Sequence, residues 1–211
     1  MLYTKSDYQT ADLNEVYDLV DALTLGTLVT AHEGGVAISH PIFMTDRNRG
    51  DNGTLISHLA AANEHVELLR RGLPTVAVMM DMGHYISSSW YPNYPERDSA
   101  PTWGFKVVHF SGRPQMIGQK ETVQHLGDLV AHMEKGRDKP WHMRELGPGG
   151  LGRRLPHIAA FEIPVERIEV KFKLGQDERP ADMKAAVSHL RDEGLGALAA
   201  DIVRHGNLDG K

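Results

Sequence analysis

The stretch LGTLVTAHEGGVAISHPIFMTD, residues 25–46, contains two runs rich in strand-forming residues. The runs LGTLVTA and GVAISHPIFMTD meet at the tetrapeptide HEGG. Gly34 and Gly35 allow positive φ angles, which the tight turn of a β-hairpin requires. The stretch therefore predicts two antiparallel strands joined by a short turn.

Further strand-like runs and helical patterns follow along the chain. The strand-like runs are TLISHLA (54–60), LPTVAVMMD (73–81), TWGFKVVHFSGRPQMIG (102–118) and HIAAFEIPVERIEVKFKL (157–174). The third of them is expected to bend near Gly112 and Pro114. Apolar spacing predicts helices over residues 11–23, 63–71, 120–136 and 179–206. The Gly- and Pro-rich segment 145–156 predicts a connector.

The number and order of these runs indicate the fold class. Six or seven short strands with few long parallel crossovers predict a mainly antiparallel sheet. Closure into a barrel protects the edge strands of such a sheet. The 211 residues, 41% of them hydrophobic, are enough for one such domain. We therefore predict an α+β fold with a barrel core in residues 1–178 and a helical C-terminal extension, residues 179–211, packed on the same domain.

The composition argues against several classes of protein. The absence of cysteine rules out disulfides, thiolate metal sites and cysteine nucleophiles. The sequence contains no run of about eighteen apolar residues, so it predicts no membrane span. The N-terminal residues lack the apolar segment of a secretion signal, so a cytoplasmic protein is expected. None of the 12 histidines has the spacing of a known metal motif, so no metal site is expected.

Charge and glycine patterns narrow the function further. The net charge is −5, whereas a dedicated nucleic-acid-binding protein usually has a basic face. Arginines occur in pairs, Arg70–Arg71 and Arg153–Arg154, and no helix-turn-helix pattern is present. The sequence GPGGLG, residues 147–152, matches no phosphate-loop motif and is interpreted as part of the connector.

The stretch GHYISSSWYP, residues 83–92, combines three adjacent hydroxyl groups with two aromatic rings. No nucleophile-elbow motif surrounds the serines, so they are interpreted as a binding device. Hydroxyl and amide groups of a bent segment bind phosphate or ring oxygens, and Trp90 and Tyr91 offer faces for stacking. The alternative is a loop of hydroxyl-bonded turns whose aromatic rings plug one end of the barrel.

The same stretch, followed by APTWGFKVVHFSG and FEIPVERIEVKFKLGQ, resembles the PaiB-type family of FMN-binding negative transcriptional regulators. The stretches LGTLVTAHEGGVAISHPIFMTD and GTLISHLAAANEHVELL match the family in the same order, so the resemblance covers roughly residues 1–190. It implies an FMN-binding split β-barrel related to the pyridoxamine-phosphate-oxidase-like flavoproteins. It also implies a homodimer with the flavin in a groove at the subunit interface.

The matching motifs imply which residues bind the cofactor. Polar residues near a strand end and a helix start, the central motif, the PTW motif and the last strand contribute Ser57, His58, Asn63, Tyr85, Ser87, Ser89, Trp90, Thr102, Trp103, Lys171, Lys173 and Gln176. Strand alternation places Lys171 and Lys173 on one face, where both can meet a phosphate. Alternatively, His58 is a hydrogen-bonded, partly buried histidine and the lysines form a solvated strand face. No catalytic residue is assigned.

The chain departs from the family pattern at five of its positions. Family members typically read P-T-W-N-Y and G-K-x-K-L-S-Q-N, whereas this chain has Gly104, Phe105, Val170, Gly175 and Asp177 at the differing positions. These departures remove groups that could hydrogen-bond a ligand. An inward-pointing Asp177 would repel a phosphate.

Three functions follow from the resemblance. The first is negative regulation of transcription, with direct or indirect contact to DNA. The second is an FMN-dependent oxidoreductase acting on a small substrate. The third is haem binding or handling, because related split barrels bind haem and His189 and His205 are available near the C-terminus.

Overall fold

The computed structural model describes residues 2–10, 12–94, 96 and 98–208. Strands β1 (Thr27–His32) and β2 (Gly35–Ser39) form the predicted hairpin. His32 pairs with Gly35 at its turn, and Gly35 adopts a φ of 128°, in the region that favours glycine. The hairpin turn is therefore confirmed. The second predicted strand, residues 35–46, is instead two strands, β2 and β3 (Phe43–Asp46), which lie at opposite edges of the sheet. Pro41, which has no backbone N–H to donate to a neighbouring strand, lies between them.

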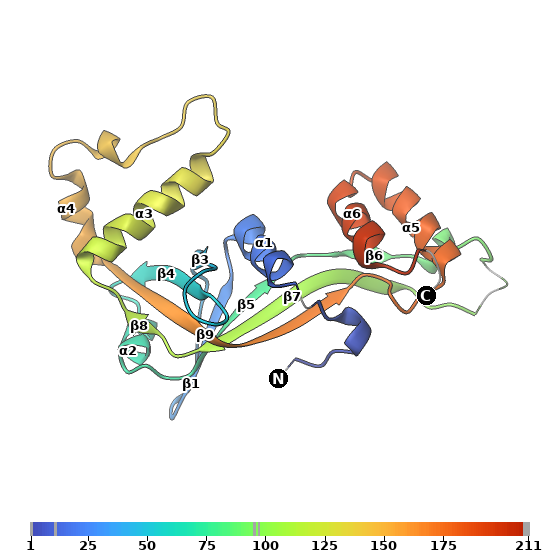
Figure 1. The fold of residues 1–211 in the computed structure, drawn as a ribbon, viewed down its shortest axis with the longest axis horizontal. Helices are drawn as coiled ribbons and strands as arrows, with labels where there is room; N and C mark the ends of the chain where they lie inside the picture. Colours follow the sequence, from blue (N-terminus) through green and yellow to red (C-terminus); the bar gives the residue numbers. More distant parts are fainter. Residues whose placement is uncertain (1, 11, 95, 97, 209–211) are drawn as a thin grey trace. The chain divides into compact units, whose positions relative to one another are not determined.

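The described strands form one sheet of nine, in the order β2-β1-β5-β7-β9-β4-β3, with β6 on β7 and β8 on β9 (Figure 1). The remaining strands are β3 (Phe43–Asp46), β4 (Thr54–Ala60), β5 (Thr75–Met80), β6 (His84–Ile86), β7 (Thr102–Gly112), β8 (Gln115–Met116) and β9 (Ile158–Lys173). The β1–β5, β3–β4, β4–β9, β6–β7 and β8–β9 pairs are all antiparallel. The mainly antiparallel α+β class is confirmed.

The helices also follow the predicted order. They are α1 (Leu13–Leu23), α2 (His65–Arg70), α3 (Gln119–Glu134), α4 (Gly150–Arg154), α5 (Pro180–Asp192) and α6 (Gly196–His205). The predicted C-terminal helix is two helices, because Gly194 adopts a φ of 79° between them. Among the described residues, no helix is both long and apolar enough to cross a membrane.

Local structure corrects one expectation, for the connector, and agrees with two others. The strand predicted through residue 118 ends at Gly112 and resumes as the two-residue β8, consistent with the bend expected at Gly112 and Pro114. The predicted connector 145–156 contains the short helix α4. The serine stretch forms a 3₁₀ turn, Ser88–Trp90, after the short strand β6.

The chain folds as two compact units. Unit 1 comprises Met1–Val16, Met80–Val108 and Glu169–Lys211, and unit 2 comprises Tyr17–Met79 and His109–Ile168. In unit 2, Leu55 and Ile163 pair across β4 and β9, and both are fully buried. In unit 1, Leu174, Met183 and Ile202 are fully buried. Burial of these side chains stabilises each unit by about 1.5–3 kcal/mol per residue. The boundary expected at residue 178 stays a prediction.

Candidate functional site

Unit 1 contains a pocket of about 380 Å³, which lies within the usual size range of small-molecule sites. Four of the predicted site residues line it: Thr102, Trp103, Lys171 and Lys173. The other lining residues come from the N-terminus, from β6, from β7 and from the segment after β9: Tyr3, Lys5, Tyr8, Ile86, Gly104, Phe105, Gly175, Asp177 and Glu178.

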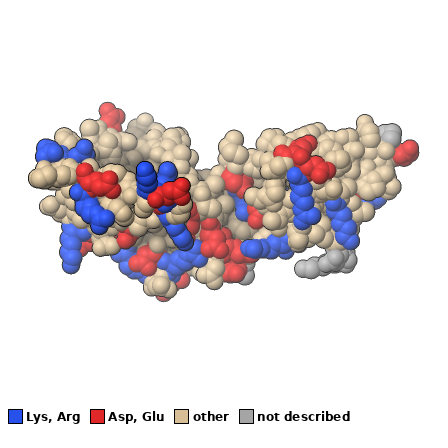
Figure 2. Space-filling model, turned by 90° about the horizontal axis from the view of Figure 1, so that it is seen from above, with Lys and Arg blue, Asp and Glu red and all other residues tan. Residues whose placement is uncertain are grey.

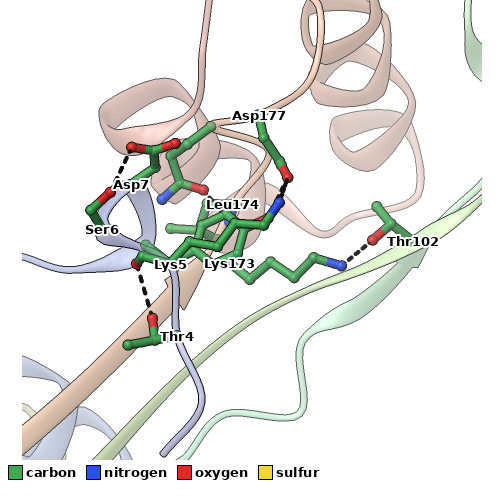
Figure 3. Close-up of polar contacts among 10 residues, drawn as sticks. Thr4, Lys5, Ser6, Asp7, Thr102, Lys173, Leu174 and Asp177 are labelled. Atoms are coloured by element: carbon green, nitrogen blue, oxygen red, sulfur yellow. Dashed lines mark hydrogen bonds and ion pairs between the residues drawn. The ribbon is translucent and has the colours of Figure 1, made fainter.

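The two predicted lysines both face this pocket, as strand alternation requires. The Lys173 ammonium donates a hydrogen bond to the Thr102 hydroxyl, as Figure 3 shows. The Lys171 Nζ lies 5.6 Å from the centres of the Tyr3 and Phe105 rings, within cation–π range of each. Neither ammonium has an acidic partner among the described residues, so both positive charges are available to an anion.

A third lysine in the pocket is already paired. The Lys5 Nζ lies 2.8 Å from Asp177 Oδ2, and the Tyr8 hydroxyl donates to the same oxygen at 2.5 Å (Figure 3 shows the lysine contact). Burial alone would raise the pKa of Asp177, but the hydrogen bonds from Lys5 and Tyr8 outweigh it and lower that pKa. Burial, together with the bond to Asp177, raises the pKa of Tyr8 to about 12. At neutral pH, Asp177 is therefore ionised and Tyr8 is a neutral donor.

Aromatic surface is exposed beside the cations. Trp103 is 49% exposed, and its Nε1 donates to the Met82 carbonyl at 3.0 Å, which orients the indole. Tyr85, 44% exposed, pairs with Trp103 across β6 and β7. Directly opposed residues of an antiparallel pair point to the same face, so the two rings form a stacking surface. Tyr85 itself does not line the pocket.

The polar groups of the serine motif and of Gln176 already have hydrogen-bond partners within the protein. The Ser87 hydroxyl lies 2.7 Å from that of Ser89 and accepts from the Ser89 amide at 3.2 Å. The Trp90 ring stacks on His189, with ring centres 5.2 Å apart. Gln176 bonds the backbone of Phe172 and Leu174, which closes the turn after β9. The hydroxyl-bonded turn of the alternative interpretation is present, and a ligand role for these residues stays a prediction.

Three predicted residues belong to unit 2, and their polar atoms have partners there. The Ser57 hydroxyl, fully buried, donates to the Ile42 carbonyl at 2.7 Å. Asn63 donates to Ser39 and accepts from the backbone of His65. The His58 Nδ1 lies 3.0 Å from His125 Nε2. Burial lowers the pKa of His58, which keeps its ring neutral. These contacts give all three residues structural roles, and cofactor binding by them stays a prediction.

The departures from the family pattern have a partial structural explanation. Gly175 adopts a φ of 84°, and a Cβ there would lie 2.0 Å from Met183 Sδ, so only glycine fits. Gly104 is buried, and a Cβ would lie 3.1 Å from Ile86 Cδ1. Asp177 lines the pocket, but its charge is compensated by Lys5.

Sequence reasoning missed Tyr3, Lys5 and Tyr8. The segment MLYTKSDY has no periodicity and looks like any solvated N-terminus. A lysine between two tyrosines, Lys5 between Tyr3 and Tyr8, is the cue that could have found it. The pocket that results joins ammonium groups to flat aromatic faces. Its chemistry fits a planar ligand that carries a phosphate, as FMN does.

Both histidines considered for haem have partners inside unit 1. His189 stacks on Trp90, and His205 Nε2 lies 3.3 Å from Glu15 Oε1. Among the described residues, no group of three or more His, Asp or Glu side chains is arranged to hold a metal ion.

Comparison with solved structures supports the fold. The FAD- and heme-binding protein from Mycobacterium smegmatis superposes with a TM-score of 0.60 at 15% identity, covering 83% of this chain and 78% of that one. The flavocytochrome Anf3 from Azotobacter vinelandii gives a TM-score of 0.56 at 15% identity, and the match covers 79% of this chain and 69% of that one. At these identities the likeness shows the fold alone, a split barrel.

Comparison of sequences identifies the family. Protease synthase and sporulation protein PAI 2 of Bacillus subtilis (strain 168) is 28% identical over 193 residues, which cover 91% of this chain and 90% of that protein. Uncharacterized protein YKL070W of Saccharomyces cerevisiae is 36% identical over 114 residues, 52% of this chain and 67% of that protein. The model of the family described as "Putative FMN-binding domain" matches residues 2–167. The chain therefore belongs to this FMN-binding domain family, as its resemblance to the PaiB-type proteins predicts.

Proposed function

We propose that this protein binds FMN in the pocket of unit 1. One observation carries the proposal: two lysine ammonium groups that have no acidic partner in the described part of the chain face the same pocket as an exposed tryptophan. Lys171 and Lys173 would hold the phosphate, and Trp103 would contact the flavin ring. When bound, FMN supplies redox chemistry through its ring, and the residues named here bind and orient it.

The charges explain why a phosphate is favoured. Lys173 uses one of its three N–H donors on the neutral hydroxyl of Thr102, and no other described residue pairs with its charge or its two remaining donors. Lys171 lies beside two rings, and none of its N–H donors is bonded to a residue that the structure describes. A charge-assisted hydrogen bond contributes about 1.5–3 kcal/mol. Two such bonds to a phosphate far exceed what the lysines would offer a neutral ligand.

The experiment compares FMN with riboflavin, which lacks the phosphate. Quenching of flavin fluorescence gives Kd for the wild type and for the Lys171→Ala/Lys173→Ala variant. We expect FMN affinity to fall by at least about a hundredfold and riboflavin affinity to change less than about twofold. Lys184→Ala removes an exposed lysine of α5 outside the pocket and serves as control. Equal losses for the two ligands would contradict the proposed phosphate site.

We further propose that the protein is a homodimer. Val36 and Ile38 on β2 are 59% and 60% exposed. Ile38 pairs with Val29 on β1, which in turn pairs with Val76 on β5. These pairs form an apolar row across three strands of unit 2, and a second copy of the chain would cover it. Light scattering should give a dimer for the wild type and a monomer for Ile38→Lys. A monomeric wild type at micromolar concentration would contradict this.

We also propose a role in the negative regulation of transcription, with only weak electrostatic contact to DNA. Residues 135–154 hold six basic residues and two acidic ones in a chain of net charge −5. The six are all exposed: Lys135, Arg137, Lys139, Arg144, Arg153 and Arg154. On the face in Figure 2, however, blue and red side chains are interspersed and form no continuous basic stripe. This distribution supports contact with phosphates and offers little sequence selectivity.

The DNA proposal is tested by fluorescence anisotropy with the promoter region of the protein's own gene at physiological salt, with and without FMN. We expect a Kd no tighter than roughly micromolar, and a further loss for Lys139→Gln/Arg144→Gln. Nanomolar, sequence-selective binding by the protein alone would show a direct repressor and contradict the weak contact proposed here.

A further inference from the structure

The N-terminal segment, residues 2–8, forms one wall of the ligand pocket. Its Leu2 amide donates to Glu169 Oε1 at 3.0 Å, which ties the start of the segment to β9. The Tyr3 ring lies beside Lys171, and Tyr8, only 5% exposed, anchors the other end. In Figure 3 the Lys5 side chain extends from this segment toward Asp177, which follows β9. The wall is therefore fixed by contacts with the strand that carries the two lysines and with the residues just after it.

Asp177 is the centre of the contact between the segment and the pocket. Its Oδ2 accepts from both Lys5 and Tyr8. The Asp177 and Lys5 side chains are 33% and 50% exposed, so solvent and a ligand can both reach this ion pair. Carboxylate oxygens and phosphate oxygens are both negatively charged acceptors, so an ammonium group can bind either. Lys5 can therefore exchange its bond to Asp177 for a bond to a ligand phosphate with little change in free energy.

We propose that Asp177 acts as an internal counter-ion that competes with the phosphate of the ligand for Lys5. This inference rests on FMN binding as proposed above, and it adds Lys5 and Asp177 to the residues that set the affinity for a phosphorylated ligand. Lys5 attracts the phosphate, whereas Asp177 repels it and also occupies Lys5. The two residues therefore have opposite effects on FMN affinity and no effect on riboflavin.

The test measures Kd for FMN and riboflavin by fluorescence quenching in three variants. Lys5→Ala should weaken FMN binding about three- to tenfold, and Asp177→Asn should strengthen it about as much. This is the size of one charge interaction of about 1 kcal/mol through water. Riboflavin should change less than twofold in both. Asp7→Asn removes the same charge from an exposed side chain of the same segment that does not line the pocket, and it should leave both affinities unchanged.

A second measurement, limited proteolysis, uses only the wild-type protein and so does not require the Asp177→Asn variant to fold. Trypsin cleaves after lysine, and FMN held by Lys5 should slow cleavage at this residue in the wild-type protein, whereas riboflavin at equal saturation should not. Equal protection by both ligands, or an FMN affinity that Lys5→Ala and Asp177→Asn leave unchanged, would overturn the inference. A wild type that binds neither flavin would instead refute the proposed function itself, so the two failures are distinguishable.

Discussion

The His58 Nδ1 lies 3.0 Å from the His125 Nε2, and the two imidazole rings meet edge to face with their centres 5.2 Å apart. His125 is 3% exposed, and its Nδ1 has no hydrogen-bond partner among the described residues. A buried acceptor without a partner costs less than a buried N–H without one. The favoured arrangement is therefore neutral, with Nε2–H of His125 donating to His58.

This pair predicts a loss of stability in acid. Burial and, to a smaller extent, the neighbouring His58 together lower the pKa of His125 to about 4. Between about pH 6.5 and 4 the unfolded chain therefore binds a proton that the folded protein does not, so the free energy of unfolding falls as pH falls. We expect a loss of about 3 kcal/mol from His125 over this range. Urea unfolding from pH 7 to pH 4 measures it, and His125→Gln should flatten the slope. An unchanged slope would contradict the assignment.

The buried hydrogen bonds around His65 predict a stability cost for Thr30→Val. The Thr30 hydroxyl lies 2.8 Å from His65 Nε2 and 2.7 Å from the Thr75 hydroxyl, and all three side chains are buried. Valine removes the hydroxyl and leaves both partners without it, which costs about 1–3 kcal/mol. Thr27→Val, at a solvent-exposed bond to His40, should change the free energy of unfolding by less than about 0.5 kcal/mol. Similar values for the two variants in urea would argue against the role of this network.

Alanine substitutions at two glycines with similar φ angles distinguish the stability cost of backbone strain from that of steric overlap. Gly175 and Gly194 have φ of 84° and 79°, but only at Gly175 does an added Cβ meet Met183. Gly194→Ala should cost about 1–2 kcal/mol, the penalty of the left-handed region alone. Gly175→Ala should cost more by about 1–3 kcal/mol, because Met183 must move within a packed core. Thermal unfolding of both variants measures the difference, and equal costs would show that Met183 adapts freely.

Trp90 and Trp103 are expected to act on different properties. The Trp90 ring stacks on His189 at an interplanar angle of 17°, so Trp90→Ala should lower the free energy of unfolding by about 2 kcal/mol. Trp103 is half exposed and lines the pocket, so Trp103→Ala should leave stability within about 0.5 kcal/mol and weaken FMN at least about threefold. Differential scanning calorimetry and FMN titration of both variants test this. A loss of FMN affinity in Trp90→Ala with unchanged stability would restore Trp90 as the stacking residue.

Local patterns in the sequence predicted most of the elements. The helix expected over 120–136 and the last strand lie within about two residues of their observed bounds, and the turn of the first hairpin lies where it is predicted. Alternation along that last strand also placed Lys171 and Lys173 on one side, and both line the pocket. These features depend on neighbouring residues, which is why pattern and family resemblance find them.

Whether a polar group is available to bind a ligand depends on hydrogen-bond partners that are distant in the sequence. The hydroxyl of Ser57 and the amide of Gln176 looked like ligand groups, yet both are bound to backbone. Lys5, which no motif indicated, enters the pocket because it pairs with Asp177, 172 residues away in the sequence. The sequence alone therefore establishes where most strands and helices lie along the chain, the family and the two lysines on one face. Only folding settles which donors and acceptors remain for a ligand, because contacts between distant residues satisfy some of them and leave others free.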